Sequence, residues 1–360
     1  MTNRTNHIAG TFLIEAPASF LNGAGLGDGE NRNVTVPKTF RDGGYRVPYV
    51  SAQAWKRWLR NTLIEETGWP ASELRAIGES ERGTTAKIAG ELDPVEYPED
   101  DIFGYMRAEK GQGRKSDEDV EEEGEIKKGG KIKALIRASP FAASILMSLR
   151  RSGVLSKDEG FVHLKEGTPL PYTTEFYNTH LQGVFCLNVG RLGVFKNIGD
   201  RVELDDSKIV EWIRSGKITI TSEEPAGKVY GLTDTKLRAS RGAAVLRALA
   251  RLRGGAKQAA FGTDVSPKVL VSAGLSCGNP VFNSIFIDDG NGPQLKVETL
   301  QEIVRDYSDR ITTNVYIGLR KGYLKNEAEV MKLSGTQEKG VILVVTTPID
   351  AAEQMAKTLG

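Results

Sequence analysis

Apolar residues recur along the chain with two different spacings, and each spacing predicts a different kind of element. Residues 7–15 are rich in Ile, Phe and Leu and predict a first strand. Residues 50–66 predict an amphipathic helix, with Ser51 in place as its N-cap. The buried stripe expected for this helix consists of Trp55, Trp58, Leu59, Thr62 and Leu63.

Similar patterns continue towards the C-terminus. The apolar run at 132–149 does not separate helix from strand, whereas 178–189 predicts a strand. Residues 240–253 predict a second helix that Gly254-Gly255 would end as a glycine C-cap. Its expected core row is Val245, Leu249 and Leu252. The pattern ends with strands at 268–273, 281–288 and 341–347 and a helix at 297–311.

Three stretches interrupt these patterns. Residues 17–46 are rich in Gly, Asn and Asp and predict a long loop. Residues 67–131 predict an insertion whose charged part, 107–131, is expected to be flexible. Residues 196–235 predict a second excursion, with a helix near 209–213 and a strand at 217–221.

Without the excursions, the predicted order is strand, helix, strand, strand, helix, strand. This order is typical of α+β ferredoxin-like and RRM-like folds. Such a sheet leaves one face open, and that face commonly binds single-stranded RNA.

Composition narrows the classes of protein. The 360 residues are 39% hydrophobic and 26% charged, as in soluble globular proteins, and the net charge of +1 gives no global field that would attract a polyanion. There is no signal-peptide pattern and no apolar stretch of membrane-spanning length, so we expect a cytoplasmic protein. The two cysteines, Cys186 and Cys277, are expected to be small buried hydrophobes in a reducing compartment.

Basic residues gather around the second predicted helix. Residues 236–257 contain no acidic residue and seven basic ones: Lys236, Arg238, Arg241, Arg247, Arg251, Arg253 and Lys257. The first helix carries Lys56, Arg57 and Arg60. Each group alone is better explained by a solvated helix face. Two basic helices in one core favour a track for a polyanion.

Catalytic patterns are weak. His7, His163 and His180 have neither metal-ligand spacing nor a nearby nucleophile, and Gly23–Gly27 lacks a complete phosphate-loop fingerprint. Acidic residues in the first loop could hold a metal, although a solvated loop explains them better; they are Asp28, Glu30 and Asp42. We therefore expect no metal, no cofactor and no catalysis.

Several segments resemble one protein family. Val47–Arg60 is similar to a Ser-x-Gln-x-x-Lys-Arg helix, Asp101–Met106 to an Asp-x-Phe-Gly-Tyr-Met element, and Arg137–Phe141 to an Arg-x-Ser-Pro segment. Asn22, Pro37-Lys38 and Gly254–Gln258 complete the match, which spans about residues 20–260. The chain thus resembles the DevR-type backbone subunit of Cascade, the CRISPR type I effector complex, and is most similar to type I-B in the RAMP superfamily.

The resemblance implies an architecture and a function. It implies an RRM-like palm (1–63, 132–191 and 236–360), a finger insertion (64–131) with a flexible charged loop, and a thumb hairpin (192–235). Copies would stack head-to-tail along the guide RNA (crRNA) and present it to target DNA, together with other Cascade subunits. The alternative is a type III-like subunit that cuts target RNA with a metal, using Asp28.

The resemblance also implies which residues contact RNA. Arg32 is added from its place in the basic part of the first loop. The implied contacts are Asn22, Lys38, Ser51, Gln53, Lys56, Arg60, Arg137, Gly254, Gly255, Lys257 and Gln258.

Overall fold

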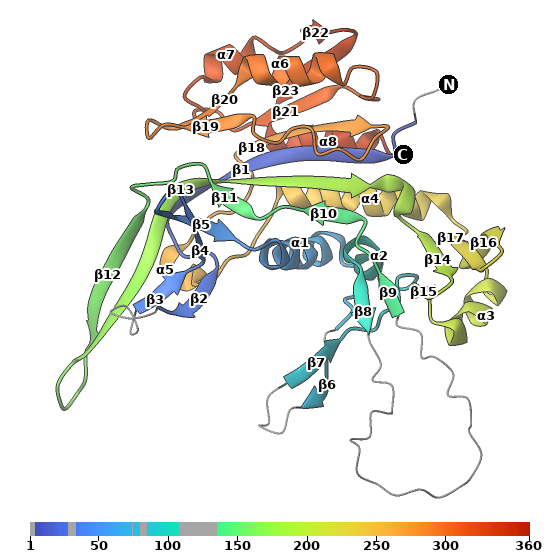
Figure 1. Cartoon of the computed structure of the whole chain (residues 1–360), viewed down its shortest axis with the longest axis horizontal. Helices are drawn as coiled ribbons and strands as arrows, with labels where there is room; N and C mark the ends of the chain where they lie inside the picture. Colours follow the sequence, from blue (N-terminus) through green and yellow to red (C-terminus); the bar gives the residue numbers. More distant parts are fainter. Residues whose placement is uncertain (1–3, 28–33, 74, 80–84, 108–134) are drawn as a thin grey trace, which may run out of the picture. The chain divides into compact units, whose positions relative to one another are not determined.

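The computed structural model describes residues 4–27, 34–73, 75–79, 85–107 and 135–360, and the chain divides into two compact units (Figure 1). Unit 1 consists of Met1–Trp69, Pro140–Leu192 and Lys236–Gly360. Unit 2 consists of Pro70–Ser139 and Gly193–Thr235. Most of the two predicted excursions therefore belongs to a single unit, and residues 132–139 fall in unit 2.

Unit 1 is built on a large sheet with β1 (His7–Ser19) near its centre. Along the main path of this sheet, neighbouring strands are antiparallel except for β21 and β23, which are parallel. On one side of β1 follow β18 (Val269–Leu275), β21 (Val315–Leu319), β23 (Val341–Thr346) and β22 (Gln337–Glu338). On the other side follow β13 (Leu170–Asn188), β11 (Leu146–Ser148), β5 (Tyr45–Val50) and β4 (Thr39–Asp42).

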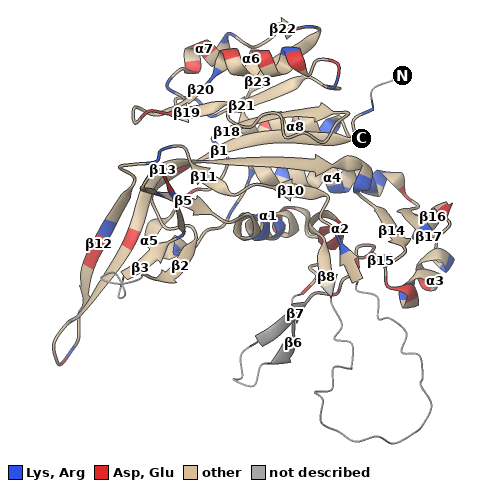
Figure 2. Cartoon of the chain, in the orientation of Figure 1, with Lys and Arg blue, Asp and Glu red and all other residues tan. Residues whose placement is uncertain are grey.

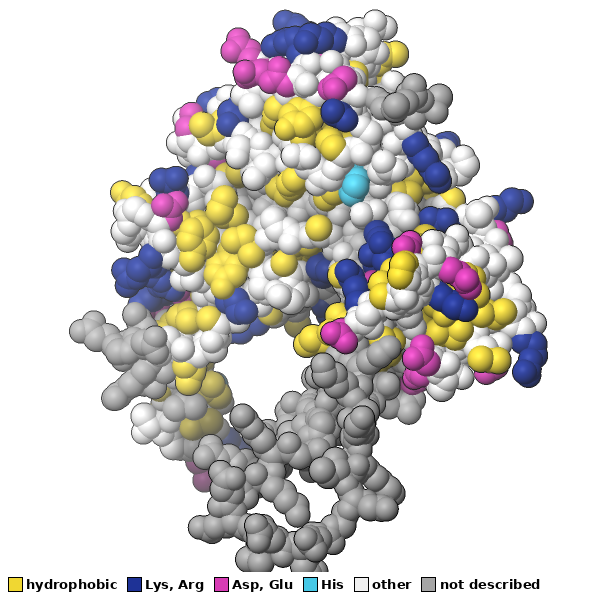
Figure 3. Space-filling view, turned by 45° about the vertical axis from the view of Figure 1, so that its right-hand side comes forward, with side chains coloured by type: hydrophobic (Ala, Val, Ile, Leu, Met, Phe, Trp, Pro, Cys, Tyr) yellow, Lys and Arg dark blue, Asp and Glu magenta, His cyan; other side chains and the backbone are white. Residues whose placement is uncertain are grey.

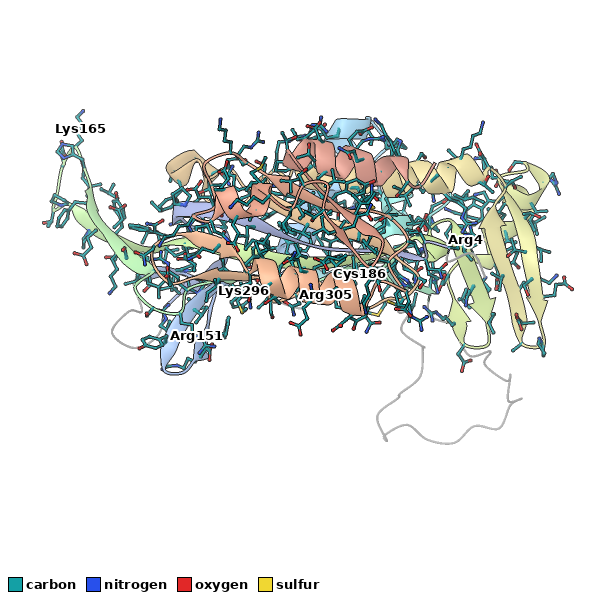
Figure 4. All side chains as sticks on the ribbon, turned by 90° about the horizontal axis from the view of Figure 1, so that it is seen from above. Arg4, Arg151, Lys165, Cys186, Lys296 and Arg305 are labelled. Carbon is teal, nitrogen blue, oxygen red and sulfur yellow. The ribbon has the colours of Figure 1, made fainter. Side chains whose placement is uncertain are left out.

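Helices cover both faces of this sheet. α1 (Ala52–Thr67), α4 (Thr235–Ala250) and α8 (Pro348–Lys357) lie on one face, and α6 (Val297–Asp306) lies on the other (Figure 4). Other short elements of this unit include the 3-10 turn η2 (Val189–Arg191), α5 (Gln258–Phe261), α7 (Glu327–Met331), and the hairpin β19 (Phe286–Asp288) and β20 (Pro293–Leu295). Among the described residues, no helix has the length and apolar character that a membrane crossing needs.

The first predicted helix is confirmed. Ser51 caps α1 by accepting a hydrogen bond from the Ala54 amide, and four of the five expected core residues are buried. Trp55 packs edge-on against Phe12 of β1, with ring centroids 5.4 Å apart. Only Trp58 is half-buried.

The second predicted helix is confirmed in part. The expected row Val245, Leu249 and Leu252 is buried. However, α4 ends at Ala250, and Gly254 has φ +145°, outside the left-handed helical region. The expected glycine C-cap is therefore wrong.

The expectation of an open sheet face is wrong at the centre of the sheet. Phe12 faces α1, whereas Ala9 and Leu13 share a core with Leu300 and Val304 of α6. β1 is thus buried on both faces, which explains its nearly continuous run of apolar residues. Cys186 joins the same core as a free thiol whose pKa burial raises to about 11.

The long loop predicted at 17–46 is also wrong. This segment holds β2 (Gly23–Leu26), β3 (Val34–Pro37), β4 and the start of β5, and β3 pairs in parallel with Thr173 and Thr174 of β13. The ambiguous run at 132–149 forms strands, namely β9 (Leu135–Arg137) in unit 2 and β10 (Phe141–Ala143) and β11 in unit 1.

A two-stranded arm, which the sequence pattern did not predict, extends from the sheet of unit 1 (Figure 1). It is made of β12 (Leu155–Val162) and the first half of β13, paired from Leu155↔Tyr177 to Val162↔Leu170. Lys165 lies at its far end (Figure 4). We call these two strands the arm.

Unit 2 contains a six-stranded sheet in the order β16-β17-β14-β15-β9-β8. The helix and strand predicted near 209–213 and 217–221 are confirmed as α3 and β16. The charged segment expected to be flexible lies almost entirely outside the described residues. The elements are β6 (Arg75–Glu79), β7 (Thr85–Ala89), α2 (Pro98–Phe103), β8 (Tyr105–Arg107), β9, β14 (Val194–Ile198), β15 (Arg201–Val202), α3 (Asp206–Arg214), β16 (Ile218–Glu224) and β17 (Gly227–Leu232).

Candidate nucleic-acid interface

Segments that are far apart in the sequence meet beside the N-terminus of α1. The side-chain oxygen of Asn22 accepts a hydrogen bond from the Ser51 amide (3.0 Å), and its carbonyl accepts one from the Lys38 amide (2.8 Å). The neighbouring Leu21 carbonyl accepts one from Ala256 (2.9 Å). We call residues 21–22, Lys38, Ser51 and 254–258 the Asn22 junction. It brings together seven of the predicted RNA contacts.

The two glycines of the junction allow close packing. A Cβ at Gly254 would overlap the indole of Trp58, and one at Gly255 would lie 2.6 Å from Leu21 Cδ2. Both have positive φ, +145° and +110°, which disfavours other residues. The Gln258 amide donates to the Gly254 carbonyl and holds the bend. These residues therefore have clear roles in folding.

Lys257 is the exposed cation of the junction. Its Nζ donates to Thr174 Oγ1 on β13 (3.0 Å) and lies 4.8 Å from the centre of the Phe20 ring. Sequence reasoning missed Phe20 and Thr174, because no local pattern joins positions 20, 174 and 257. The first turn of α1 contains no acidic residue, so the positive end of the helix dipole adds to the cationic character here.

The polar row on α1 lies away from the bend. Lys56 and Arg60 are each two positions from Trp58, which places them about 160° from it around the helix. Gln53, in the same row, is exposed, and burial lowers the pKa of the Lys56 ammonium. Because Gly254 packs on Trp58, the prediction that this row and the glycine bend line one groove is wrong.

The cations of the second basic segment are largely engaged within the protein. Arg247 pairs with Glu353 of α8 (Nε–Oε2 2.5 Å), and Arg253 pairs with Glu65 and Glu66 of α1 (2.9 and 2.7 Å). Figure 2 shows the cations of α1 and α4, and Figure 3 shows Lys and Arg interspersed with Asp and Glu over one face. Carboxylates therefore neutralise Arg247 and Arg253, which removes these two cations from the predicted polyanion track along this helix.

Arg137 belongs to the core of unit 2. Its side chain is fully buried, pairs with Asp101 and with Glu203 (Nη1–Oε2 2.9 Å), and lies over the Phe195 ring. It also donates to the carbonyl oxygens of Asp101 and Val194. The prediction that Arg137 contacts RNA is wrong, because two internal carboxylates and two carbonyls already satisfy the guanidinium.

The remaining predictions concern the first loop. Arg32, Asp28 and Glu30 lie outside the described residues, whereas Asp42 pairs with Arg151 (2.9 Å). Within the part of the chain that the structure describes, no group of three or more His, Cys, Asp or Glu side chains is placed to hold a metal ion.

Comparison with known proteins yields a likeness of fold. No family model and no curated protein matches the chain. Two chains, from structures titled "CRISPR RNA-guided surveillance complex" and "CRISPR RNA-guided surveillance complex, pre-nicking", align with 98% of this chain and 100% of their own length. Their sequence identities are 14% and 13%, and their TM-scores are 0.51 and 0.54. The chain therefore has the fold of these subunits of CRISPR surveillance complexes.

Proposed function

We propose that the chain is a guide-RNA-binding backbone subunit of a type I CRISPR Cascade surveillance complex, without catalytic activity. The observation that carries this proposal is the alignment of both chains over essentially their whole lengths. A match of a common subdomain alone would leave the insertions uncovered. The partners would be crRNA, target DNA through the guide, further copies of the chain and other Cascade subunits.

The strand order of unit 1 supports an RRM-like palm. Its inner strands run β18-β1-β13-β11. In the sequence, α1 lies between β1 and β11, and α4 lies between β13 and β18. This order agrees with a split βαββαβ core, to which the C-terminal strands and α6 would be additions. Unit 2 would then contain both the finger and residues 193–235. We assign the arm, which belongs to unit 1, to contact with a neighbouring copy.

Repeated contact between the arm of one copy and the next copy would explain assembly along an RNA strand. An arm that binds a different surface on the next copy makes a heterologous contact, which continues into a filament unless it closes into a ring. The filament would hold the guide by its backbone, and base pairing would select the target sequence.

The Asn22 junction is the strongest candidate for the RNA backbone contact. Lys257 and Lys38 would supply positive charge, and the amide groups at the start of α1 would supply hydrogen-bond donors. The glycine bend would let the protein backbone approach the RNA backbone closely. The row of Gln53, Lys56 and Arg60 would form a second contact on the opposite flank of α1.

Salt dependence of RNA binding tests the proposal. Binding of labelled single-stranded RNA should weaken with salt by about 0.7 log units per log unit of salt for each phosphate contact. Lys38→Ala/Lys257→Ala and Lys56→Ala/Arg60→Ala should each flatten the slope by about one unit or more. The matched control, Arg310→Ala/Lys332→Ala, removes two exposed cations remote in sequence from both sites and should leave the slope unchanged. Absence of RNA binding would refute the function, and unchanged slopes in both variants would refute the sites.

A further inference from the structure

One face of the arm carries an aromatic ring that is partly open to solvent. Tyr172, Thr174 and Phe176 alternate along β13 and therefore share a face. The Tyr172 ring lies against Gly160 of β12, where a Cβ would come within 2.6 Å of ring carbon Cζ. Tyr172 is nevertheless 46% exposed. One side of the ring thus packs on the neighbouring strand, and the rest faces solvent.

Lys257 reaches the same face of the arm. Its ammonium donates to Thr174, one alternate position along the strand from Tyr172, which corresponds to about 7 Å. Phe20 lies beneath the ammonium, and Phe261 joins Phe20 to Phe176 through ring contacts of 6.5 and 6.0 Å. The cation is therefore held in place by a hydroxyl and an aromatic ring.

An aromatic face beside a fixed cation has the chemistry to bind a nucleotide. Bases stack on aromatic side chains irrespective of sequence, and an ammonium group binds phosphate as a point charge. The separation between Tyr172 and Lys257 is one that a single nucleotide can span between its base and its phosphate.

We propose that Tyr172 and Lys257 form a subsite for one nucleotide of single-stranded RNA, in which the base stacks on Tyr172 and the phosphate binds Lys257. This subsite rests on the proposed RNA-binding function and extends the contact from the Asn22 junction onto the arm. Thr174 and Phe20 are positioning residues, since they hold the Lys257 ammonium.

Asp158 tests whether negative charge on this face opposes RNA binding. It pairs directly across from Thr174 and so lies on the same face, where its carboxylate opposes a bound phosphate. Removing this charge by Asp158→Asn should tighten RNA binding, whereas Lys257→Ala should weaken it and flatten the salt slope by about 0.7.

The decisive experiment compares ordinary single-stranded RNA with the same strand carrying abasic nucleotides. Tyr172→Leu keeps an apolar cover over Gly160 but removes the aromatic face, so it should weaken binding of ordinary RNA about fivefold or more. Tyr172→Phe should stay close to wild type. On abasic RNA the three proteins should bind alike. Tyr45→Leu is the matched control, because Tyr45 is a comparably exposed tyrosine (53%) on β5.

The outcomes separate this subsite from the wider function. Equal binding of ordinary RNA by wild type and Tyr172→Leu would overturn the subsite while the RNA-binding function stands. Failure of the wild type to bind RNA would refute the function itself. If Tyr172→Leu does not fold, binding by the wild type alone tests the subsite. The wild type must then bind ordinary RNA more tightly than abasic RNA, and equal binding of the two would overturn the subsite.

Discussion

Gly254 packs against the indole of Trp58, at a position where no Cβ could fit. This contact fixes the bend after α4 to one flank of α1 and leaves the row of Lys56 and Arg60 on the other. The bend therefore stabilises the packing of α1 and also forms part of the candidate RNA site.

Replacing Gly254 should destabilise the protein strongly. Gly254→Ala introduces both backbone strain at φ +145° and overlap with Trp58, so we expect a loss of at least about 2 kcal/mol in the free energy of unfolding. Gly262→Ala is the matched control, because Gly262 also has positive φ (+58°) but no atom within 4 Å of an added Cβ. It should cost about 1 kcal/mol. Equal losses in urea unfolding would show that the Trp58 contact is unimportant.

Arg137 should matter for stability and leave the salt slope of RNA binding unchanged. Arg137→Met leaves Asp101 and Glu203 buried without their guanidinium, which should cost about 3–5 kcal/mol. Arg201→Met removes the more exposed partner of the same Glu203 and should cost less than about 1 kcal/mol. Urea unfolding followed by circular dichroism measures both. Comparable effects for the two variants would contradict the assignment of Arg137 to the core.

Acid should weaken unit 1 through His180. Burial lowers the pKa of His180, although Asp288 acts in the opposite direction, and its Nδ1 lies 2.8 Å from the Tyr323 hydroxyl. A lowered pKa means that the folded state resists protonation, so stability is complete above about pH 6.5 and declines as the pH falls below it.

Substitution of His180 tests this pH dependence. His180→Gln should reduce the drop in melting temperature between pH 7.5 and 5.5, whereas His163→Gln, at an exposed position after β12, should behave like wild type. Burial also lowers the pKa of His7, so some acid sensitivity should persist in His180→Gln. Identical drops in all three proteins would rule out a role for His180.

The fold was predictable where local pattern and tertiary packing agree. Ser51, Trp55 and Leu59 have the capping and spacing of a helix, and α1 forms as expected. The two-sided burial of β1 is reflected in its nearly continuous apolar run, which is atypical of a sheet with one open face. The short strands β2 to β4 were missed because the segment that contains them, 17–46, is rich in Gly, Asn and Asp, which are typical of loops.

The candidate site was less predictable, because its geometry depends on contacts distant in sequence. The basic character of Arg247, Arg253 and Arg137 was evident, but their carboxylate partners lie between 36 and 188 positions away in the sequence. The pairing of Lys257 with Thr174 has the same origin. Sequence identifies which residues can bind phosphate, whereas tertiary structure decides which of them are still available.

We also predict that the protein does not cut RNA. An assembled complex incubated with complementary RNA and Mg²⁺ should leave the RNA intact. Regularly spaced cuts that disappear in Asp28→Ala would favour the type III-like alternative, in which an acid of the first loop acts with a metal. A catalytically inert result in both wild type and variant is expected.

The most direct test of the central claim is the mass of the complex formed with RNA of increasing length. Native mass spectrometry or light scattering on the purified chain with single-stranded RNAs of increasing length should show stepwise addition of copies as the strand lengthens. Each added copy should correspond to a constant increment of nucleotides. A single copy on every RNA, or no complex at all, would contradict a subunit that assembles along a guide.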